Sequence, residues 1–141
     1  MKRLHVSISV KDMDQSTAFY TTLFGAEPTV AKPGYAKWML DDPRVNFVID
    51  QRCGAPGVDH LGIQAEDAAE LRAVTDRLKA AGRPVIEQED AACCYARSDK
   101  TWSADPQGVT WETFYTHGTD ETVYGDNVVR LDELIAESAA D

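Results

Sequence analysis

The chain contains little cysteine, with three residues among 141. An odd number of cysteines fits poorly with the disulfide frameworks that stabilise small secreted domains. The N-terminus also lacks the apolar segment of a signal peptide, and no apolar run approaches the roughly 20 residues that a membrane-spanning helix needs. We therefore expect a cytoplasmic protein with reduced thiols and no membrane partner.

Basic residues are also few. Fourteen Lys and Arg stand against 24 Asp and Glu, which gives a formal net charge of -10 at pH 7. Part of this surplus lies at the end of the chain, where residues 118–141 hold seven acidic side chains and one Arg. Because nucleic acid is bound largely through Lys and Arg contacts to phosphate, we expect no nucleic-acid partner.

The remaining composition is that of an ordinary globular protein, with 43% hydrophobic and 27% charged residues. A length of 141 residues allows one domain or two small halves that pack closely. The sequence favours the second arrangement, because a pattern recurs 55 residues apart. His-Val-Ser-Ile-Ser-Val-Lys-Asp (residues 5–12) aligns with His-Leu-Gly-Ile-Gln-Ala-Glu-Asp (residues 60–67).

Each copy of the pattern predicts a strand, a helix and three further strands. Residues 4–10 alternate between apolar and polar side chains, as a half-buried strand does, with His5 on the polar face. Asp12 or Asp14 and later Asp67 are typical helix N-caps, and Gly25 and Gly82 are typical helix ends. We predict that the first helix turns Ser16, Phe19, Tyr20, Leu23 and Phe24 inward, and that the remaining strands cover residues 28–31, 35–40, 45–50, 85–89, 92–98 and 109–115.

These elements predict an α+β fold of two tandem βαβββ modules. The modules would comprise residues 1–50 and 58–116, joined by a linker at residues 51–57. The acidic tail at residues 117–141 would form a short helix or fray. Whether the modules pair within one chain or across a homodimer stays open at this point.

The repeat gives a chemical meaning to two histidines. His5 and His60 occupy matched positions on first strands, and related modules that pack together can bring these strands face to face. The last strand adds Glu112, which would share a face with Thr110 and Phe114. Two histidines and one carboxylate form the facial triad of non-haem Fe(II) sites, although Zn, Mn, Co or Ni accept similar ligands. The alternatives are satisfied strand histidines and a solvated Glu112, and Asn46 is a weaker candidate for a fourth ligand.

The run from Asp90 to Trp102 contains the adjacent pair Cys93 and Cys94. Two neighbouring thiols suit a thiophilic ion such as trivalent arsenic or cadmium, because soft ligands select soft acceptors. The alternative is that both are small buried apolar residues. We expect Arg97 to Lys100 to form a mobile surface loop that carries the thiol pair toward the metal.

Other residues receive weaker assignments. Four aromatic side chains could line an apolar pocket, although aromatic strand residues more often belong to a core. These are Tyr35, Trp38, Tyr95 and Trp102. Cys53 in the linker could pass arsenic to the thiol pair, but a lone thiol there is more simply incidental. His117, which we place just past the last strand, is expected to be a surface residue.

Several motifs together resemble a known family. The duplicated pattern, the paired His5 and His60, and Asp-Pro-Gln-Gly-Val-Thr-Trp-Glu (residues 105–112) are similar to the vicinal oxygen chelate superfamily, which includes glyoxalases, bleomycin-resistance proteins and extradiol dioxygenases. Gly-Tyr-Ala-Lys-Trp (34–38), Asp-His-Leu-Gly (59–62) and Cys-Cys-Tyr-Ala-Arg-Ser-Asp-Lys (93–100) resemble its ArsI/CadI branch, which is linked to organoarsenical and cadmium resistance.

The resemblance implies a glyoxalase-like barrel or cleft and a carbon-arsenic lyase that uses Fe(II), or another divalent metal, with dioxygen as co-substrate. It implies His5, His60 and Glu112 as metal ligands and Cys93 and Cys94 as ligands of a trivalent methyl or aromatic arsenical. Tyr35, Tyr95, Lys100 and Trp102 would contribute more weakly to substrate binding, and no catalytic residue is implied beyond the metal ligands. One position departs from the branch, where relatives can carry Gln in place of His5.

Two other functions stay open on the sequence alone. One is a non-catalytic protein that sequesters cadmium or arsenic through its thiols. The other is a different metal-dependent enzyme of the same superfamily, in which the thiol pair plays no part in turnover.

Overall fold

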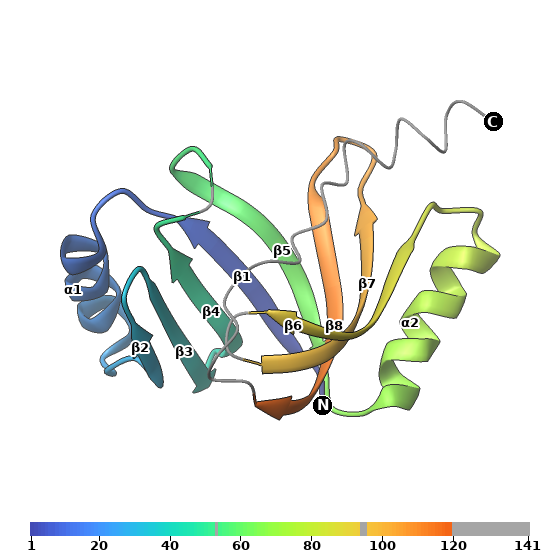
Figure 1. The fold of residues 1–141 in the computed structure, drawn as a ribbon, viewed down its shortest axis with the longest axis horizontal. Coiled ribbons are helices and arrows are strands. Elements are labelled where there is room, and N and C mark those ends of the chain that lie inside the picture. Colours follow the sequence, from blue (N-terminus) through green and yellow to red (C-terminus); the bar gives the residue numbers. More distant parts are fainter. Residues whose placement is uncertain (53, 94–95, 120–141) are drawn as a thin grey trace. The chain divides into compact units, whose positions relative to one another are not determined.

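A computed structural model of the chain describes residues 1–52, 54–93 and 96–119 (Figure 1). These residues form two compact units, which we call the first unit, residues 3–62, and the second unit, Met1–Lys2 together with the chain from Ile63 onward. Along the sequence, a strand, a helix and three strands are followed by the same order again. The predicted α+β class and the tandem βαβββ order are therefore confirmed.

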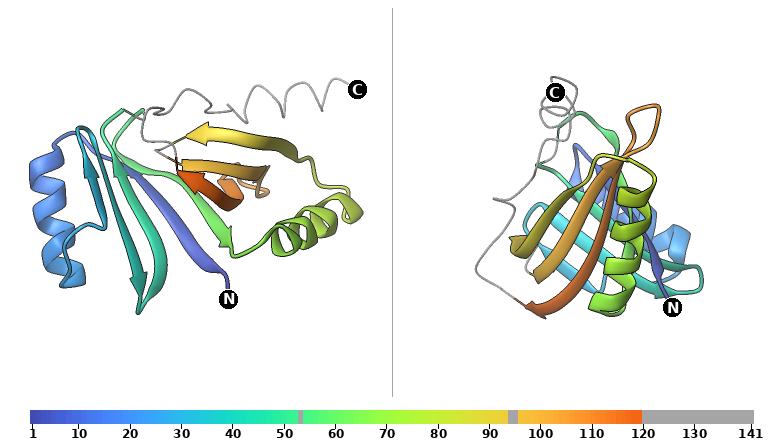
Figure 2. Two further views of the ribbon diagram at one scale, coloured as in Figure 1. Left: turned by 60° about the horizontal axis from the view of Figure 1, so that its bottom comes forward. Right: turned by 90° about the vertical axis from the view of Figure 1, so that its right-hand side faces the viewer.

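The first unit is a mixed sheet with one helix. It contains β1 (Arg3–Ser9), α1 (Met13–Phe24), β2 (Val30–Lys32), β3 (Tyr35–Asp41), β4 (Arg44–Asp50) and the first part of β5 (Gly57–Ala65). The strand order is β2-β3-β4-β1-β5, with β1 parallel to β4 and the β2-β3-β4 pairs antiparallel. Figure 2 shows α1 against these strands, where it contacts β4.

Helix α1 has the termini that the sequence predicts. The Asp12 side chain caps its start by accepting a hydrogen bond from the Gln15 N–H at 2.9 Å, and Gly25 ends it in the left-handed region with φ 65°. Tyr20 and Phe24 pack against the aromatic core of the sheet.

The predicted inward face of α1 is partly wrong, because Phe19 and Leu23 are 59% and 61% exposed. Each precedes an inward-facing aromatic residue by one position, which turns its side chain about 100° around the helix axis.

Strand β1 alternates as predicted, but its polar face is also buried. Val6 and Ile8 pack on the core that α1 covers. The side chains of His5, Ser7 and Ser9 are only 5%, 4% and 3% exposed. His5 therefore lies on a polar face that is shielded from solvent.

The second unit contains the end of β5, α2 (Ala68–Ala80), β6 (Ile86–Cys93), β7 (Ala96–Ala104) and β8 (Thr110–Thr119), in the strand order β5-β8-β7-β6. Asp67 caps α2 as predicted, accepting from the Glu70 N–H at 2.8 Å. The carboxylate of Glu70 accepts from the Glu66 N–H in return. Leu71, Val74 and Thr75 form the buried side of the helix.

The strands after α2 depart from the prediction. Residues 92–98 are not one strand, because β6 ends at Cys93 and β7 begins at Ala96. The predicted surface loop from Arg97 to Lys100 is also wrong, since these residues belong to β7 and Ser98 and Lys100 are buried. Here polar side chains point inward, which hides the alternation by which a half-buried strand is predicted. His117 lies within β8 rather than beyond the last strand.

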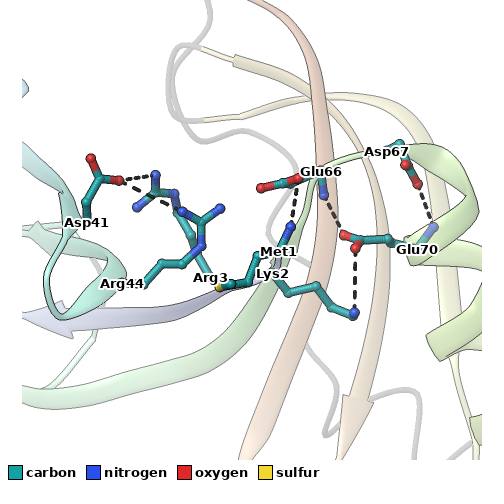
Figure 3. A network of polar contacts seen from close by, with 8 residues as sticks. All are labelled: Met1, Lys2, Arg3, Asp41, Arg44, Glu66, Asp67 and Glu70. Carbon is teal, nitrogen blue, oxygen red and sulfur yellow. Dashed lines mark hydrogen bonds and ion pairs between the residues drawn. The ribbon is translucent and has the colours of Figure 1, made fainter.

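Figure 3 shows ion pairs within each unit. In the first unit, Arg3 at the start of β1 binds the Asp41 carboxylate at 2.6 Å. In the second unit, the Met1 amino group lies 2.8 Å from Glu66 and the Lys2 ammonium lies 3.6 Å from Glu70.

Neither of the described helices is long and apolar enough to span a membrane.

Candidate functional site

The histidines singled out by the repeat lie together in the first unit. His5 is on β1 and His60 is on β5. Their Nε2 atoms are 3.1 Å apart, and the ring centroids are separated by 5.1 Å with an angle of 49° between the planes. The contact therefore involves one specific nitrogen of each ring.

The other nitrogen of each ring faces an acceptor. The Nδ1 atom of His5 lies 3.1 Å from the Asn46 carbonyl oxygen, and Asn46 pairs with His5 between β4 and β1. The Nδ1 atom of His60 lies 2.7 Å from the Asp59 carboxylate. The hydrogen bond from His60 holds the pKa of the Asp59 carboxyl below its usual range, although partial burial opposes this shift. Both acceptors can only accept, so Nδ1 carries the proton in both histidines.

This arrangement fits a bound cation. The Nε2 atoms of the two rings face each other across 3.1 Å. When both rings are neutral and carry their proton on Nδ1, both Nε2 lone pairs are available to one cation placed between them. Divalent metals bind imidazole nitrogen at roughly 2.0–2.1 Å, so two nitrogens within about 4.2 Å can share one ion. The donor set therefore suits Fe, Zn, Cu or Ni.

The predicted carboxylate ligand, Glu112, lies on β8 of the second unit and is buried. Its Oε1 atom is 3.7 Å from the Nζ atom of Lys100, which is also buried and which lies 5.7 Å from the centre of the Trp102 ring. Trp102 donates its Nε1–H to Gln88 at 3.0 Å. The structure thus groups Glu112 with Lys100 and Trp102, two of the weaker predicted substrate residues. The sequence prediction missed this ion pair because it placed Lys100 in a loop.

Tyr35 lies elsewhere. It is buried on β3 opposite Asp50, which in turn pairs with Ser9 on β1. That register places Tyr35 roughly 13 Å along the strands from His5, at about 3.3 Å per residue. It lines a groove of about 650 Å³ between α1 and the turn that joins β2 to β3. Trp38 belongs to the core and donates to the Ala26 carbonyl.

The thiol pair is only partly within the described residues. Cys93 ends β6, where its backbone pairs with Ala96. The Cys93 side chain lies outside the described part of the chain, and so do Cys94, Tyr95, Cys53 and the tail from residue 120 onward.

A cluster of charges lies where β6 ends and β7 begins. Arg97 donates to both oxygens of Asp90 at 2.9 and 2.7 Å, and these hydrogen bonds hold the pKa of the Asp90 carboxyl below its usual range. Asp90 itself adopts φ 49°, and its N–H donates to Asp99 at 2.8 Å. His117 lies 3.2 Å from the same Asp99 carboxylate. The pairing of β6 with β7 is irregular at this point, so these side chains hold a bulged segment.

Sequence reasoning also missed Asp59. The signal was present, because an acidic residue directly precedes His60 in the Asp-His-Leu-Gly motif. Carboxylates often accept the second ring N–H of a metal-binding histidine.

Comparison with known proteins shows the family to which the chain belongs. The family model described as Glyoxalase/Bleomycin resistance protein/Dioxygenase superfamily matches residues 2–113. A relative from Bacillus sp. (strain MD1), "Trivalent organoarsenical cleaving enzyme", is 44% identical over 126 residues, which cover 86% of this chain and 77% of the relative. A protein of the same name from Thermomonospora curvata is 37% identical over 125 residues, covering 87% and 83%.

A solved structure is similar in fold. The Mn(II)-bound glyoxalase from Novosphingobium aromaticivorans has a TM-score of 0.60 and 20% sequence identity, and the match covers 92% of this chain and 44% of that protein.

Proposed function

Because the chain belongs to the glyoxalase/bleomycin resistance protein/dioxygenase superfamily, we propose that it is an enzyme that cleaves the carbon-arsenic bond of trivalent organoarsenicals. Two relatives that carry this activity in their names are 44% and 37% identical over most of the chain. The structural observation that best supports the proposal is the His5–His60 pair, whose Nε2 atoms face each other at 3.1 Å.

The proposed metal ligands are His5, His60 and Glu112, whose donor types can together hold a metal ion. Two imidazoles and one carboxylate leave positions open and suit Fe(II), which is the metal we propose, although related divalent ions accept the same ligands. When bound, Fe(II) supplies the dioxygen chemistry that amino-acid side chains lack. The task of this chain is to present these ligands already deprotonated and oriented.

The proposed substrate ligands are Cys93 and Cys94. Methylarsenite, CH3As(OH)2, has one carbon bond and two exchangeable hydroxyl groups. Two thiols replace both hydroxyl groups, and each thiol proton leaves in a water molecule. The carbon substituent then remains as the third group on arsenic. Lys100, Trp102, Tyr95 and Tyr35 would contribute more weakly to the surroundings, and we propose no catalytic residue beyond the metal ligands.

The overall reaction balances with one dioxygen per methylarsenite. CH3As(OH)2 and O2 contain the same atoms as arsenite, As(OH)3, and formaldehyde. Arsenic stays trivalent, the methyl carbon is oxidised, and dioxygen accepts the electrons that carbon loses. We place this reaction in the cytoplasm, where thiols stay reduced, and it requires neither nucleic acid nor membrane.

Arsenic speciation tests the proposal. Reduced protein, with and without Fe(II), is incubated with methylarsenite in the presence and absence of dioxygen. The arsenic species are then separated and quantified. We expect arsenite only when both iron and dioxygen are present. Tight arsenic binding without release would instead indicate a thiol-based binding protein, and neither binding nor release would indicate a different reaction of the superfamily.

Variants separate the two proposed sites. Replacing Cys93 and Cys94 by Ser should abolish both arsenic binding and arsenite release. Glu112→Ala should stop release and largely preserve arsenic binding through the thiols. Cys53→Ser, which removes a thiol that has no proposed role, is the matched control and should keep full activity.

A further inference from the structure

The two histidines of the pair are supported in different ways. His5 directs its Nδ1–H to the main-chain carbonyl of Asn46 at 3.1 Å, within the ordered β1–β4 pairing. His60 directs its Nδ1–H to the Asp59 side chain at 2.7 Å. The Nδ1 atom of His60 therefore faces a carboxylate that a substitution can remove.

The Asp59 carboxylate affects which ring nitrogen of a neutral His60 carries the proton, Nδ1 or Nε2. In a neutral His5 whose Nδ1 atom carries the proton, the Nε2 atom is an acceptor. If the proton of His60 moved to Nε2, this atom would donate to the Nε2 atom of His5 across 3.1 Å, a good hydrogen-bond distance. The two histidines would then form a hydrogen bond with each other, and neither Nε2 atom would offer a lone pair to a metal ion.

Asp59 opposes this self-pairing. A hydrogen bond to an ionised carboxylate is about twice as strong as one between neutral groups. The Asp59 side chain is 35% exposed and that of His60 is 16% exposed, so water screens the bond only in part. The short distance and the charge therefore favour the Nδ1–H tautomer of His60.

We propose that Asp59 is a positioning residue that keeps His60 in the Nδ1–H tautomer and so reserves both Nε2 lone pairs for a divalent metal ion. This inference rests on the metal site of the proposed function and assigns a role to a residue outside its ligand set. It does not depend on the identity of the arsenical.

Two variants test the proposal. Asp59→Ala removes the acceptor, whereas Asp59→Asn keeps an acceptor oxygen and removes the charge. Asp41→Ala is the matched control, because Asp41 is another carboxylate of the first unit, bound by Arg3 on a different strand end.

Two readouts are measured on each full-length variant. Long-range nitrogen–proton NMR correlations identify the tautomer of His60 in the metal-free protein, and anaerobic titration with Fe(II) gives the Kd. For Asp59→Ala we expect a change to the Nε2–H tautomer and a Kd that is weaker by roughly 10-fold to 100-fold. Asp59→Asn should keep the Nδ1–H tautomer and give an intermediate Kd, and Asp41→Ala should match the wild type in both readouts.

The outcomes separate this role from the enzymatic activity. An Asp59→Ala protein with the wild-type tautomer and a Kd within about twofold of wild type would overturn the inference. If Asp59→Ala fails to fold, Asp59→Asn decides, because its Kd must be weaker than that of the wild type. A wild-type chain that binds Fe(II) but releases no arsenite would refute the proposed function and leave the role of Asp59 standing.

Discussion

At the scale of single residues, we expect mutation of either partner of the ion pair between Lys100 and Glu112 to lower the stability of the protein strongly. Both side chains are buried, and the charged atoms are 3.7 Å apart. Removal of one partner from a buried ion pair generally destabilises a protein more than the pair itself stabilises it.

We therefore predict that Lys100→Met destabilises the metal-free protein. The expected decrease in the free energy of unfolding is about 3 kcal/mol, the lower end for a broken buried pair, because 3.7 Å is too long for a hydrogen bond. Urea unfolding in the presence of a chelator measures it. Lys79→Met is the control, since Lys79 pairs with Glu87 on the surface and its loss should have no measurable effect. Equal effects of the two variants would contradict the prediction.

Residue types and the repeat predict part of the candidate site. The matched positions of His5 and His60 predicted that they could meet, and their Nε2 atoms do so. The pairing of Glu112 with Lys100 could not be predicted, because it depends on which face of β7 is buried. Whether the histidines and Glu112 hold a common ion stays a proposal.

At the scale of elements, the β6–β7 hairpin combines irregular pairing with a cluster of charges. Arg97 binds Asp90 through two hydrogen bonds across the hairpin. Asp90 has a positive φ, which is uncommon for a residue other than glycine. The hydrogen bonds of its side chain and N–H thus hold a backbone conformation that the sequence alone disfavours.

We predict that Asp90→Asn lowers the stability of the chain at neutral pH but not in acid. The folded pKa of Asp90 is lowered by Arg97, so its contribution is present above the unfolded pKa of about 3.9 and is lost as the pH falls through the folded value. Urea midpoints of the wild type and the variant should differ at pH 7 and converge in acid. Asp76→Asn, on the exposed side of α2, serves as the control. A difference that grows in acid would contradict the assignment.

Elements with strong terminal signals were predictable, and strands with buried polar residues were not. Asp12, Gly25 and Asp67 marked helix ends correctly, because their side chains or backbone satisfy specific groups of the first or last turn. The division between β6 and β7 was misplaced because Ser98 and Lys100 point inward. Tertiary packing determines that these polar side chains are buried, and the local sequence pattern does not indicate it.

At the scale of the whole molecule, the ligands that we propose for the ion come from both compact units. His5 and His60 belong to the first unit and Glu112 belongs to the second. A ligand that binds only the folded state stabilises it in proportion to the logarithm of its concentration. An ion shared in this way would couple the unfolding of one unit to that of the other.

We predict that Fe(II), added without oxygen, raises the free energy of unfolding by about 2.7 kcal/mol at 100 times its Kd. Thermal unfolding of the wild type should shift upward as a single transition, and a chelator should reverse the shift. Glu112→Gln should reduce the shift, because the second unit would lose its proposed ligand. A shift of equal size in Glu112→Gln would indicate that the ion is held by the first unit alone.

The unequal support of the two histidines has a consequence for genetic variation. The partner of His5 is a main-chain carbonyl, which every amino acid supplies at position 46. The partner of His60 is a side-chain carboxylate, which few amino acids can replace at position 59. With respect to these two bonds, a saturation library should therefore accept many residues at position 46 and few at position 59.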